Sequence, residues 1–287
     1  MPSLTACILS YNRANYLREA VDSILNQSIK PTEIIIFDNC SNADVYDSIS
    51  TYLNRGVIWF GANKNLSATW NFRRAISSAK TEYLFVLHDD DRLCSNFVEE
   101  QMDFMLRHPG IGAVTCNGYL INGLGNRTGK LIINDQLNNS VKFYRSPAAV
   151  AIQYASNSCL PFSPAVYRTE FARNCNLQDN FGKVVDAVYF SDLARSGTIA
   201  YQNEPLYECR VHDAQDSSYF DTVELDKLSE YFEKEALGST TERKELIKLL
   251  IRQHTSRQLI KLCRAIYPNP SLLDVLSALA GLVHRRF

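Results

Sequence analysis

Short apolar runs alternate with longer amphipathic segments along the first half of the chain. Brief apolar runs are typical of strands that are buried on both faces, and apolar residues three or four positions apart are typical of helices that cover them. The pattern predicts strands at residues 4–9, 33–38, 57–60, 83–87 and 111–116. It predicts helices from Asn12 or Asn15, as the capping residue, to about Asn26, and at residues 44–53, 68–78 and 96–107. This alternation is the signature of βαβ units and a parallel sheet.

The second half of the chain is less regular. Asn-Gly and Gly-Asn pairs between residues 117 and 139 predict a loop or a loose hairpin. A helix is predicted over residues 184–195, ended by Gly197, and leucines recur at helical spacing from residue 221 onward. Further short strands are predicted at residues 165–167, 198–201 and 206–211. We therefore expect one α/β domain over residues 1–220 and a helical extension over residues 221–287.

Composition narrows the class of protein. The chain has 287 residues, 46% of them hydrophobic, so it can bury a substantial core. Its formal net charge is −1, and no overall positive field indicates a nucleic-acid partner. Eight cysteines are scattered without a Cys-x-x-Cys pair, which predicts reduced thiols in the cytoplasm. No apolar run approaches the ~20 residues of a membrane span.

The acidic triplet Asp89–Asp91 is the most informative stretch, because it directly follows an apolar run and His88. In an open α/β sheet, ligands bind beyond the carboxyl ends of the strands. Three adjacent carboxylates repel one another there unless a cation lies among them, and a divalent metal that carries a phosphorylated ligand is the usual solution. The alternative is a solvated acidic turn that caps the helix beginning near Ser95.

Other polar side chains follow the neighbouring predicted strands and should share the same rim of the sheet. Asp38 ends the run 33–38, and its carboxylate could accept hydrogen bonds from a nucleoside base or ribose. The alternative is an Asx-type turn with Ser41. For Asn71 the alternative is a hydrogen bond within its own helix, and for residues 10–13 it is a turn or helix cap. The remaining rim candidates are Ser10, Tyr11, Arg13 and Asn65.

Together these segments resemble the inverting family 2 glycosyltransferases with the A-type fold. The resemblance extends from about Leu4 to Ser218 and implies an α/β fold: a Rossmann-like, mostly parallel central sheet flanked by helices, with a helical C-terminal appendage. One departure is Asn65-Leu-Ser67, where many members have Asn-x-Gly. The matching motifs are Ser10-Tyr-Asn-Arg13, Asp38-Asn-x-Ser41, Asn65 with Asn71-x-x-x-Ala75-Ile76, and Glu82-Tyr followed by Leu-His-Asp-Asp-Asp91.

The resemblance implies a nucleotide-diphosphate sugar donor and a divalent metal, Mn²⁺ or Mg²⁺. The triplet takes the place of the Asp-x-Asp motif, with Asp90 as the metal contact, Asp91 supporting or sharing the metal, and Asp89 near the ribose. His212 lies in an element similar to the family's Tyr-Arg-x-His and is implied as a third metal ligand or a diphosphate contact. The alternative for His212 is a structural role. The implied donor-binding residues are Ser10, Tyr11, Arg13, Asp38, Asn65, Asn71 and Asp89.

The resemblance also implies a base on the acceptor side, since the acceptor hydroxyl must lose a proton as it attacks the anomeric carbon. The family's usual position is an acid at the start of a helix that ends at glycine. Asp186, eleven residues before Gly197, fits that frame, although Val185 stands where members often have glutamate. The alternative for Asp186 is an acid favoured by the helix dipole. Asp192, two turns further on, is expected to be surface-exposed or structural.

The C-terminal segment from residue 243 carries nine Lys and Arg against two acids, a charge of +7. A basic amphipathic helix can lie on an anionic membrane surface, which suits a polyprenyl-diphosphate-linked glycan acceptor at the inner face of the cell membrane. The alternative is that these helices pack on the domain. The family-level expectation is the synthesis of bacterial surface polysaccharide of the lipopolysaccharide O-antigen or capsule type.

Two other functions stay open at this point. A sugar nucleotidyltransferase would also bind a nucleotide on an α/β sheet, but it would need a glycine-rich phosphate loop after the first strand, which residues 10–13 do not provide. A non-catalytic nucleotide-sugar-binding protein would bind the donor without turnover and would tolerate the change of Asp186 to Asn.

Overall fold

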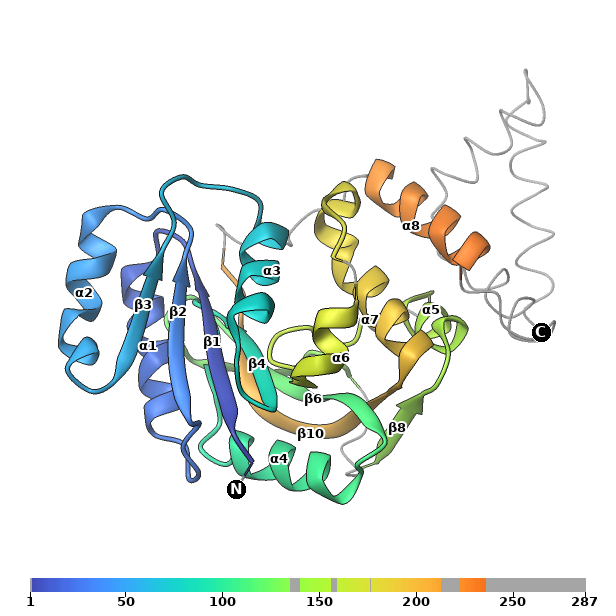
Figure 1. Cartoon of the computed structure of the whole chain (residues 1–287), viewed down its shortest axis with the longest axis horizontal. Coiled ribbons are helices and arrows are strands. Elements are labelled where there is room, and N and C mark those ends of the chain that lie inside the picture. The colour runs from blue at the N-terminus through green and yellow to red at the C-terminus, as the bar shows by residue number, and fades with distance from the viewer. Residues whose placement is uncertain (1, 135–139, 156–158, 176, 213–221, 236–287) are drawn as a thin grey trace.

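A single mixed sheet runs through the protein, with helices packed on both of its faces (Figure 1). The computed structural model describes residues 2–134, 140–155, 159–175, 177–212 and 222–235. The strand order is β3-β2-β1-β4-β9-β6-β10-β5, with β7 paired to β6 and β8 paired to β10. The predicted α/β class with a mostly parallel core is therefore confirmed.

The first half of the chain forms the parallel part of the sheet, and every predicted element is present. The four strands pair side by side, with Ser10 opposite Asp38 and Leu9 opposite His88, so that their carboxyl ends form one rim. The strands are β1 (Leu4–Ser10), β2 (Glu33–Asp38), β3 (Val57–Gly61) and β4 (Tyr83–His88). The helices are α1 (Ala14–Leu25), α2 (Ala43–Leu53) and α3 (Ala68–Ser78).

Burial on both faces explains why these strands read as continuous apolar runs. Along β1, Ala6 and Ile8 face the core formed with α1, and Cys7 faces the core formed with α3. The helix α1 begins after Arg13 without a side-chain cap, so the predicted cap by Asn12 or Asn15 is wrong. The side chain of Asn12 instead accepts a hydrogen bond from the backbone N–H of Asn42, at 2.9 Å.

The second half adds antiparallel pairs to the sheet. The strand β9 is antiparallel to both β4 and β6, whereas β10 runs parallel to β6. The strands are β5 (Arg92–Leu93), β6 (Ile111–Ile121), β7 (Arg127–Leu131), β8 (Val141–Tyr144), β9 (Val166–Arg168) and β10 (Thr198–Arg210). The helices are α4 (Phe97–Arg107), α5 (Pro147–Ala155), α6 (Thr169–Asn174), the 3-10 helix η1 (Asp179–Val184), α7 (Val185–Ser196) and α8 (Thr222–Glu235).

Two predictions for this half are corrected. Residues 117–139 were predicted as a loop or a loose hairpin, and the hairpin is present, formed by β6 and β7 with its turn at residues 122–126. The strand β6 reaches further into this region than expected, through residues 117–121, because the buried Asn117 side chain bonds both the N–H and the carbonyl of Ile133. The two strands predicted at 198–201 and 206–211 are one strand, β10, whose pairing with β6 shifts register between Gln202 and Tyr207.

The first part of the predicted helical extension, α8, packs against α5, α7 and η1 (Figure 1). Leu228 and Phe232 are buried there in the same apolar cluster as α7. The rest of the predicted extension, including the basic segment, lies outside the described residues. None of the helices in the described ranges is long and apolar enough to cross a bilayer.

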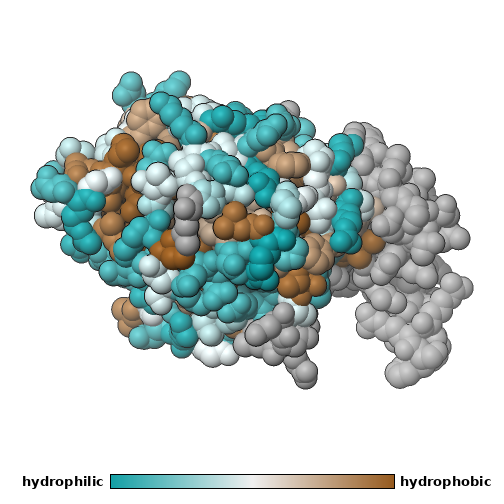
Figure 2. Space-filling model, turned by 60° about the horizontal axis from the view of Figure 1, so that its bottom comes forward, coloured by the Kyte–Doolittle hydropathy of each residue, from teal (hydrophilic) through white to brown (hydrophobic). Residues whose placement is uncertain are grey.

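Polar side chains cover most of the face drawn in Figure 2, and apolar ones gather at the end formed by α2 and β3. At that end Tyr46, Ile58 and Phe60 are exposed because β3 is the last strand of its side of the sheet.

Candidate active site

The acidic triplet directly follows β4 and is buried. The exposed fractions are 1% for Asp89, 7% for Asp90 and 4% for Asp91. The nearby helix α4 has Asn96 at its N-cap, and in its first turn the backbone N–H of Val98 donates to the side chain of Gln27, at 2.9 Å, and not to an acid of the triplet. The alternative of a solvated acidic turn that caps this helix is therefore excluded.

Asp89 is held by the loop that follows β1. The backbone N–H of Tyr11 donates to one carboxylate oxygen of Asp89 at 2.9 Å, and the Arg13 guanidinium donates to the other at 3.0 Å. Burial first, and the charge of Asp90 second, raise the pKa of Asp89 to about 7, and Arg13 opposes this rise. Asp89 thus joins the ends of β1 and β4 through charge-assisted hydrogen bonds.

Asp91 is held from the other side, by the end of β10. The backbone N–H of Arg210 donates to Asp91 Oδ1 at 3.0 Å, and the Arg210 Nε donates to the carbonyl of Asp90 at 2.8 Å. Burial and the neighbouring charge of Asp90 raise the pKa of Asp91 well above its usual range. The carboxylates of the triplet thus repel one another in a site with little water.

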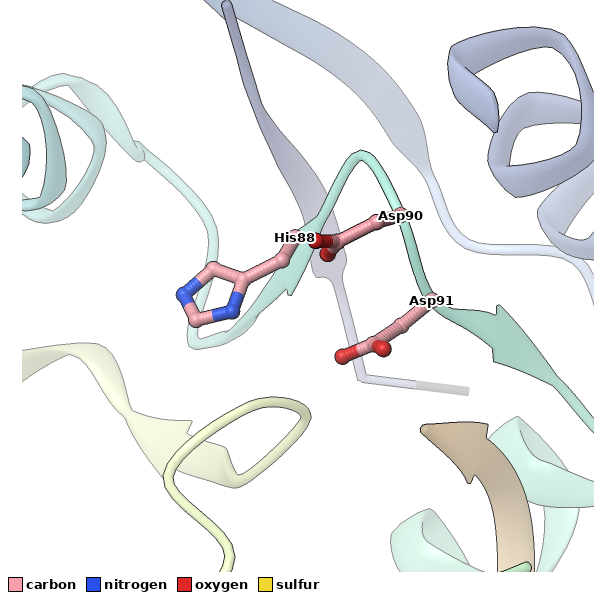
Figure 3. A group of neighbouring side chains, drawn as sticks. All are labelled: His88, Asp90 and Asp91. Atoms are coloured by element: carbon pink, nitrogen blue, oxygen red, sulfur yellow. The ribbon is translucent and has the colours of Figure 1, made fainter. Parts of the chain in front are cut away.

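The triplet and two histidines offer ligands for a divalent cation. One ligand atom from each of His88, Asp90 and Asp91 lies within 4.8 Å of the other two (Figure 3). His212 Nε2 lies 3.1 Å from Asp90 Oδ2. Carboxylate oxygens suit Mg²⁺ and Mn²⁺, and a cation among buried acids would remove the repulsion that raises their pKa values. The residues present therefore fit such an ion.

Of the predicted metal ligands, Asp90 and Asp91 belong to this group together with His88, whereas His212 contacts Asp90 but is not a member of the group. In Figure 3 the side chains of His88, Asp90 and Asp91 project into one space from the end of β4. The sequence offered one signal for His88, its place between the apolar run and the triplet, but a strand end does not reveal which way a ring points.

The predicted nucleoside-side residues lie at the neighbouring strand ends. Asp38 is buried and accepts hydrogen bonds from the backbone N–H of Ser41, at 2.9 Å, and from the Ser41 hydroxyl, which is the Asx-type turn of the alternative interpretation. Ser10, beside it in β1, is also buried, and its hydroxyl has no hydrogen-bond partner among the described residues. The carboxylate and the hydroxyl therefore lie at adjacent positions of one rim.

Two asparagines stabilise this rim. Asn65 accepts a hydrogen bond at 2.8 Å from the amide of Asn39, the residue after Asp38. Asn71 is buried, and its amide donates to the carbonyl of Phe37 in β2 at 2.7 Å rather than bonding only within its own helix. The Tyr11 side chain, by contrast, is 41% exposed.

Asp186 lies at the start of α7. Its Oδ2 accepts a hydrogen bond from the hydroxyl of Tyr154 at 3.1 Å, and its Oδ1 accepts one from the backbone N–H of Ala187 at 2.8 Å. Burial raises the pKa of Asp186 to about 6. Tyr154 comes from α5, a helix that the sequence pattern did not predict.

Two segments that precede α7 in the chain connect this region to the rim. Asp179 of η1 accepts a hydrogen bond at 2.9 Å from Ser67, the residue that caps α3. Ser163 accepts a hydrogen bond at 3.1 Å from the backbone N–H of His88, and the neighbouring Phe162 stacks on Phe72 of α3.

Comparison with known proteins places the chain in a family. The family model described as "Glycosyl transferase family 2" matches residues 5–172, which is more than half of the chain. The chain therefore belongs to glycosyltransferase family 2, and it is a glycosyltransferase. This membership decides against both alternatives, a sugar nucleotidyltransferase and a non-catalytic binding protein.

Two relatives illustrate the similarity in sequence. An uncharacterized glycosyltransferase of Rickettsia typhi is 25% identical over 238 residues, which are 83% of this chain and 71% of the relative. The chondroitin synthase of Pasteurella multocida is 27% identical over 217 residues, which are 74% of this chain and 21% of the synthase. The chain thus corresponds to a small part of that larger enzyme.

Two solved structures illustrate the similarity in fold. TarS of S. aureus in complex with UDP-GlcNAc has a TM-score of 0.65 at 14% identity, with 88% of this chain and 73% of that chain covered. The mannosyltransferase PcManGT from Pyrobaculum calidifontis, in complex with GDP-Man and Mn²⁺, has a TM-score of 0.62 at 14% identity. That match covers 100% of this chain and 81% of the other. The predicted A-type fold is confirmed.

Proposed function

We propose that this enzyme moves a sugar from a nucleotide-diphosphate sugar to a glycan acceptor with inversion at the anomeric carbon. The observation that carries the proposal is the group of His88 and the buried acids Asp90 and Asp91, at the rim that also holds Asp38. Buried, mutually repelling carboxylates need a cation, and a cation at a strand end attracts a diphosphate. The complexes of TarS with UDP-GlcNAc and of PcManGT with GDP-Man and Mn²⁺ support this assignment.

On the donor side, we assign the nucleoside to the ends of β1, β2 and β3. The hydroxyl of Ser10, which has no partner among the residues that the structure describes, and the carboxylate of Asp38 would bond the base or ribose, with Asp89 on the ribose side. Arg13 lies between the loop after β1 and Asp89, where it would approach the diphosphate. Tyr11 would contribute its exposed ring, and Asn65 and Asn71 would stabilise the rim through their bonds to Asn39 and Phe37.

Mn²⁺ or Mg²⁺ would be held by Asp90 and Asp91, with His212 as the third protein ligand. Such an ion supplies positive charge that stabilises the diphosphate as it leaves. The protein's own part is to present two carboxylates that Arg210 fixes, one through the backbone carbonyl of Asp90 and the other through a carboxylate oxygen of Asp91. A pre-fixed site of this kind does not have to reorganise while the bond breaks.

Asp186 would act as the base. A carboxylate with a pKa of about 6 is ionised at neutral pH and still takes up a proton readily, which is the compromise that a general base requires. The Tyr154 hydroxyl, bonded to Oδ2, would orient the carboxylate toward the acceptor hydroxyl. Attack from the face opposite the diphosphate would invert the anomeric centre without a covalent intermediate.

For the biological role, we propose the synthesis of bacterial surface polysaccharide of the lipopolysaccharide O-antigen or capsule type. The similarity to a polysaccharide synthase, chondroitin synthase, supports a glycan product. The charge of +7 after residue 242 supports an acceptor linked to polyprenyl diphosphate, with the enzyme on the inner face of the cell membrane.

A thermal-shift panel of UDP-, dTDP- and GDP-sugars, each with and without Mn²⁺, tests the donor assignment. We expect one nucleotide family to stabilise the protein, and only when Mn²⁺ is present. The variant Asp90→Asn should lose this stabilisation, whereas Asp47→Asn, an exposed acid on α2, should keep it. Stabilisation that is absent for every nucleotide, or that is independent of the metal, would contradict the proposal.

A further inference from the structure

We infer that Glu19 is a positioning residue for the metal site. It holds the guanidinium of Arg210 against α1, so that this cation fixes the backbone of the acidic triplet without neutralising the carboxylates of Asp90 and Asp91. The inference rests on the metal site of the proposed function. It adds to that site a residue of α1 that lies far from the triplet in the sequence.

Arg210 lies directly behind the triplet, and its side chain is fully buried. Its Nε donates to the carbonyl of Asp90 at 2.8 Å, and its backbone N–H donates to Asp91 Oδ1 at 3.0 Å. Its Nη1 donates to the carbonyl of Gly123 at 3.2 Å, and the guanidinium lies 4.3 Å from the ring centre of Tyr16. Arg210 therefore connects the triplet to the 122–126 turn and to α1.

The charge of this arginine is balanced by Glu19. The Nη2 of Arg210 lies 2.6 Å from Glu19 Oε2. Among the described residues, this contact is the ion pair of Arg210. Arginine cannot lose its proton in a protein, so a buried guanidinium needs an anion close by. The backbone of Arg210 and its Nε already contact Asp91 and Asp90, so the carboxylates of these two residues lie close to the same arginine.

Arg13 is the second arginine at the triplet, and its guanidinium contacts the carboxylates directly. Its guanidinium lies 3.0 Å from a carboxylate oxygen of Asp89 and 3.6 Å from one of Asp90, so it shares the negative charge of the triplet. Asp89 is not a member of the group of possible metal ligands. With Glu19 neutral, Arg210 would turn toward Asp90 and Asp91 in the same manner and would compete with a metal ion for their oxygens.

Glu19 is itself fixed by a chain of alternating charges. The same oxygen, Oε2, lies 3.1 Å from Arg92 Nη1, and Arg92 lies 2.6 Å from Glu208, which also pairs with Arg127 at 2.8 Å. Glu208 contacts Arg92 and Arg127 but makes no ion pair with Arg210 among the described residues. This difference provides a matched control, because loss of either glutamate weakens the same network but only loss of Glu19 releases Arg210.

The test is a titration of Mn²⁺ into the full chain, alone and with UDP or GDP, for wild type, Glu19→Gln, Glu19→Asp and Glu208→Gln. The melting temperature of each variant without metal is measured in parallel. We expect Glu19→Gln to bind Mn²⁺ about 10–100-fold more weakly, which is typical when a residue that supports metal ligands is lost. Glu19→Asp should fall between Glu19→Gln and wild type, and Glu208→Gln should lower the melting temperature without changing the Mn²⁺ affinity.

Wild-type Mn²⁺ affinity in folded Glu19→Gln would overturn the inference, since a purely structural ion pair would change only the melting temperature. An equal loss of affinity in Glu208→Gln would also overturn it. If Glu19→Gln does not fold, Glu19→Asp decides, and wild-type affinity in that variant counts against the inference. A wild-type protein that binds no Mn²⁺ under any of these conditions would instead refute the metal site of the proposed function.

Discussion

Asp90 and Asp186 are both carboxylates at the end of buried elements, but their neighbours are of different kinds. Around Asp90 lie two more acids, the guanidinium of Arg13 at 3.6 Å and the imidazole of His212 at 3.1 Å. Within the part of the chain that the structure describes, Asp186 accepts hydrogen bonds from a tyrosine hydroxyl and a backbone N–H. The first setting is built from charges and suits the binding of an ion, whereas the second is nearly neutral and suits a group that changes its protonation.

The causes of the pKa shifts follow the same division. Burial alone raises the pKa of Asp186 to about 6, whereas the pKa of Asp91 rises through burial and through the charge of Asp90. A cation at the triplet would lower the raised pKa of Asp91 and leave the raised pKa of Asp186 unchanged. The two sites can therefore be tested separately, by changes that remove one function and spare the other.

The largest effect is expected from Asp186→Asn. Loss of the base should lower the rate of transfer about 10²–10⁴-fold, while binding of the donor and of Mn²⁺ stays as in wild type. The rate is measured as nucleoside diphosphate released in the presence of acceptor. Asp192→Asn is the control on the same helix, because Asp192 bonds Tyr231 of α8 and should affect stability but not transfer. Near-normal turnover in Asp186→Asn would remove the base from this account.

Asp90→Asn should lower the rate of transfer about 10²–10³-fold by removing the charge that holds the ion beside the leaving group. In contrast to Asp186→Asn, this variant should also lose metal-dependent donor binding. Both quantities can be measured in one set of assays over a range of Mn²⁺ concentrations. A variant that loses turnover but binds donor and metal normally would break the distinction between the two sites.

Below about pH 6 the rate of transfer should follow the protonation of Asp186, and this dependence should change when Tyr154 is replaced. Transfer requires the ionised carboxylate, so the rate should fall as the pH drops below about 6. The Tyr154 hydroxyl favours the ionised form, so its loss in Tyr154→Phe should move this fall upward by about 0.5–1 pH unit. A rate profile that does not move in Tyr154→Phe would show that the hydrogen bond has no influence on the base.

The raised pKa of Asp186 also predicts how the stability of the fold depends on pH. The folded protein binds a proton at Asp186 more tightly than the unfolded chain, so ionisation destabilises the fold as the pH rises from the ordinary pKa of 3.8 to about 6, and this cost is complete above pH 6. Asp186→Asn should therefore be as stable as wild type or more so at pH 8, by on the order of 1–3 kcal/mol. Urea unfolding at pH 4 and pH 8 measures this difference.

The smallest effect is expected from Ser67→Ala, which weakens the connection between the two regions. Ser67 caps α3 and also bonds Asp179 of η1, so its loss should cost about 1 kcal/mol of unfolding free energy. Ser77→Ala, at the exposed end of the same helix, is the control and should change stability little. An equal effect of both substitutions in urea unfolding would show that the connection contributes nothing.

The parallel half of the fold could be predicted from the sequence because its signals are local. The strands β1, β2 and β4 are buried on both faces and therefore read as unbroken apolar runs. The second half depends on contacts between distant residues. Asn117 and Gly118 look like a turn, yet Asn117 is satisfied by Ile133, and a side chain at Gly118 would come within 2.7 Å of the Tyr207 ring. Such reasons are not visible in a sequence.

The candidate site shows the same limit. The triplet stood out because three acids in a row at a strand end are unusual, and Asp186 and His212 were found through the resemblance to a family. Glu19 and Tyr154 gave no signal, because one is a charged residue on a helix and the other belongs to an unpredicted helix. Their roles depend on partners that are 191 and 32 positions away along the chain.

The central claim is that the triplet binds a divalent ion and that Asp186 takes no part in this binding. The most direct test is the affinity for Mn²⁺, titrated in the presence of UDP or GDP into wild type, Asp90→Asn and Asp186→Asn. We predict equal binding by wild type and Asp186→Asn and loss of binding in Asp90→Asn. Unchanged binding in Asp90→Asn, or its loss in Asp186→Asn, would contradict the account.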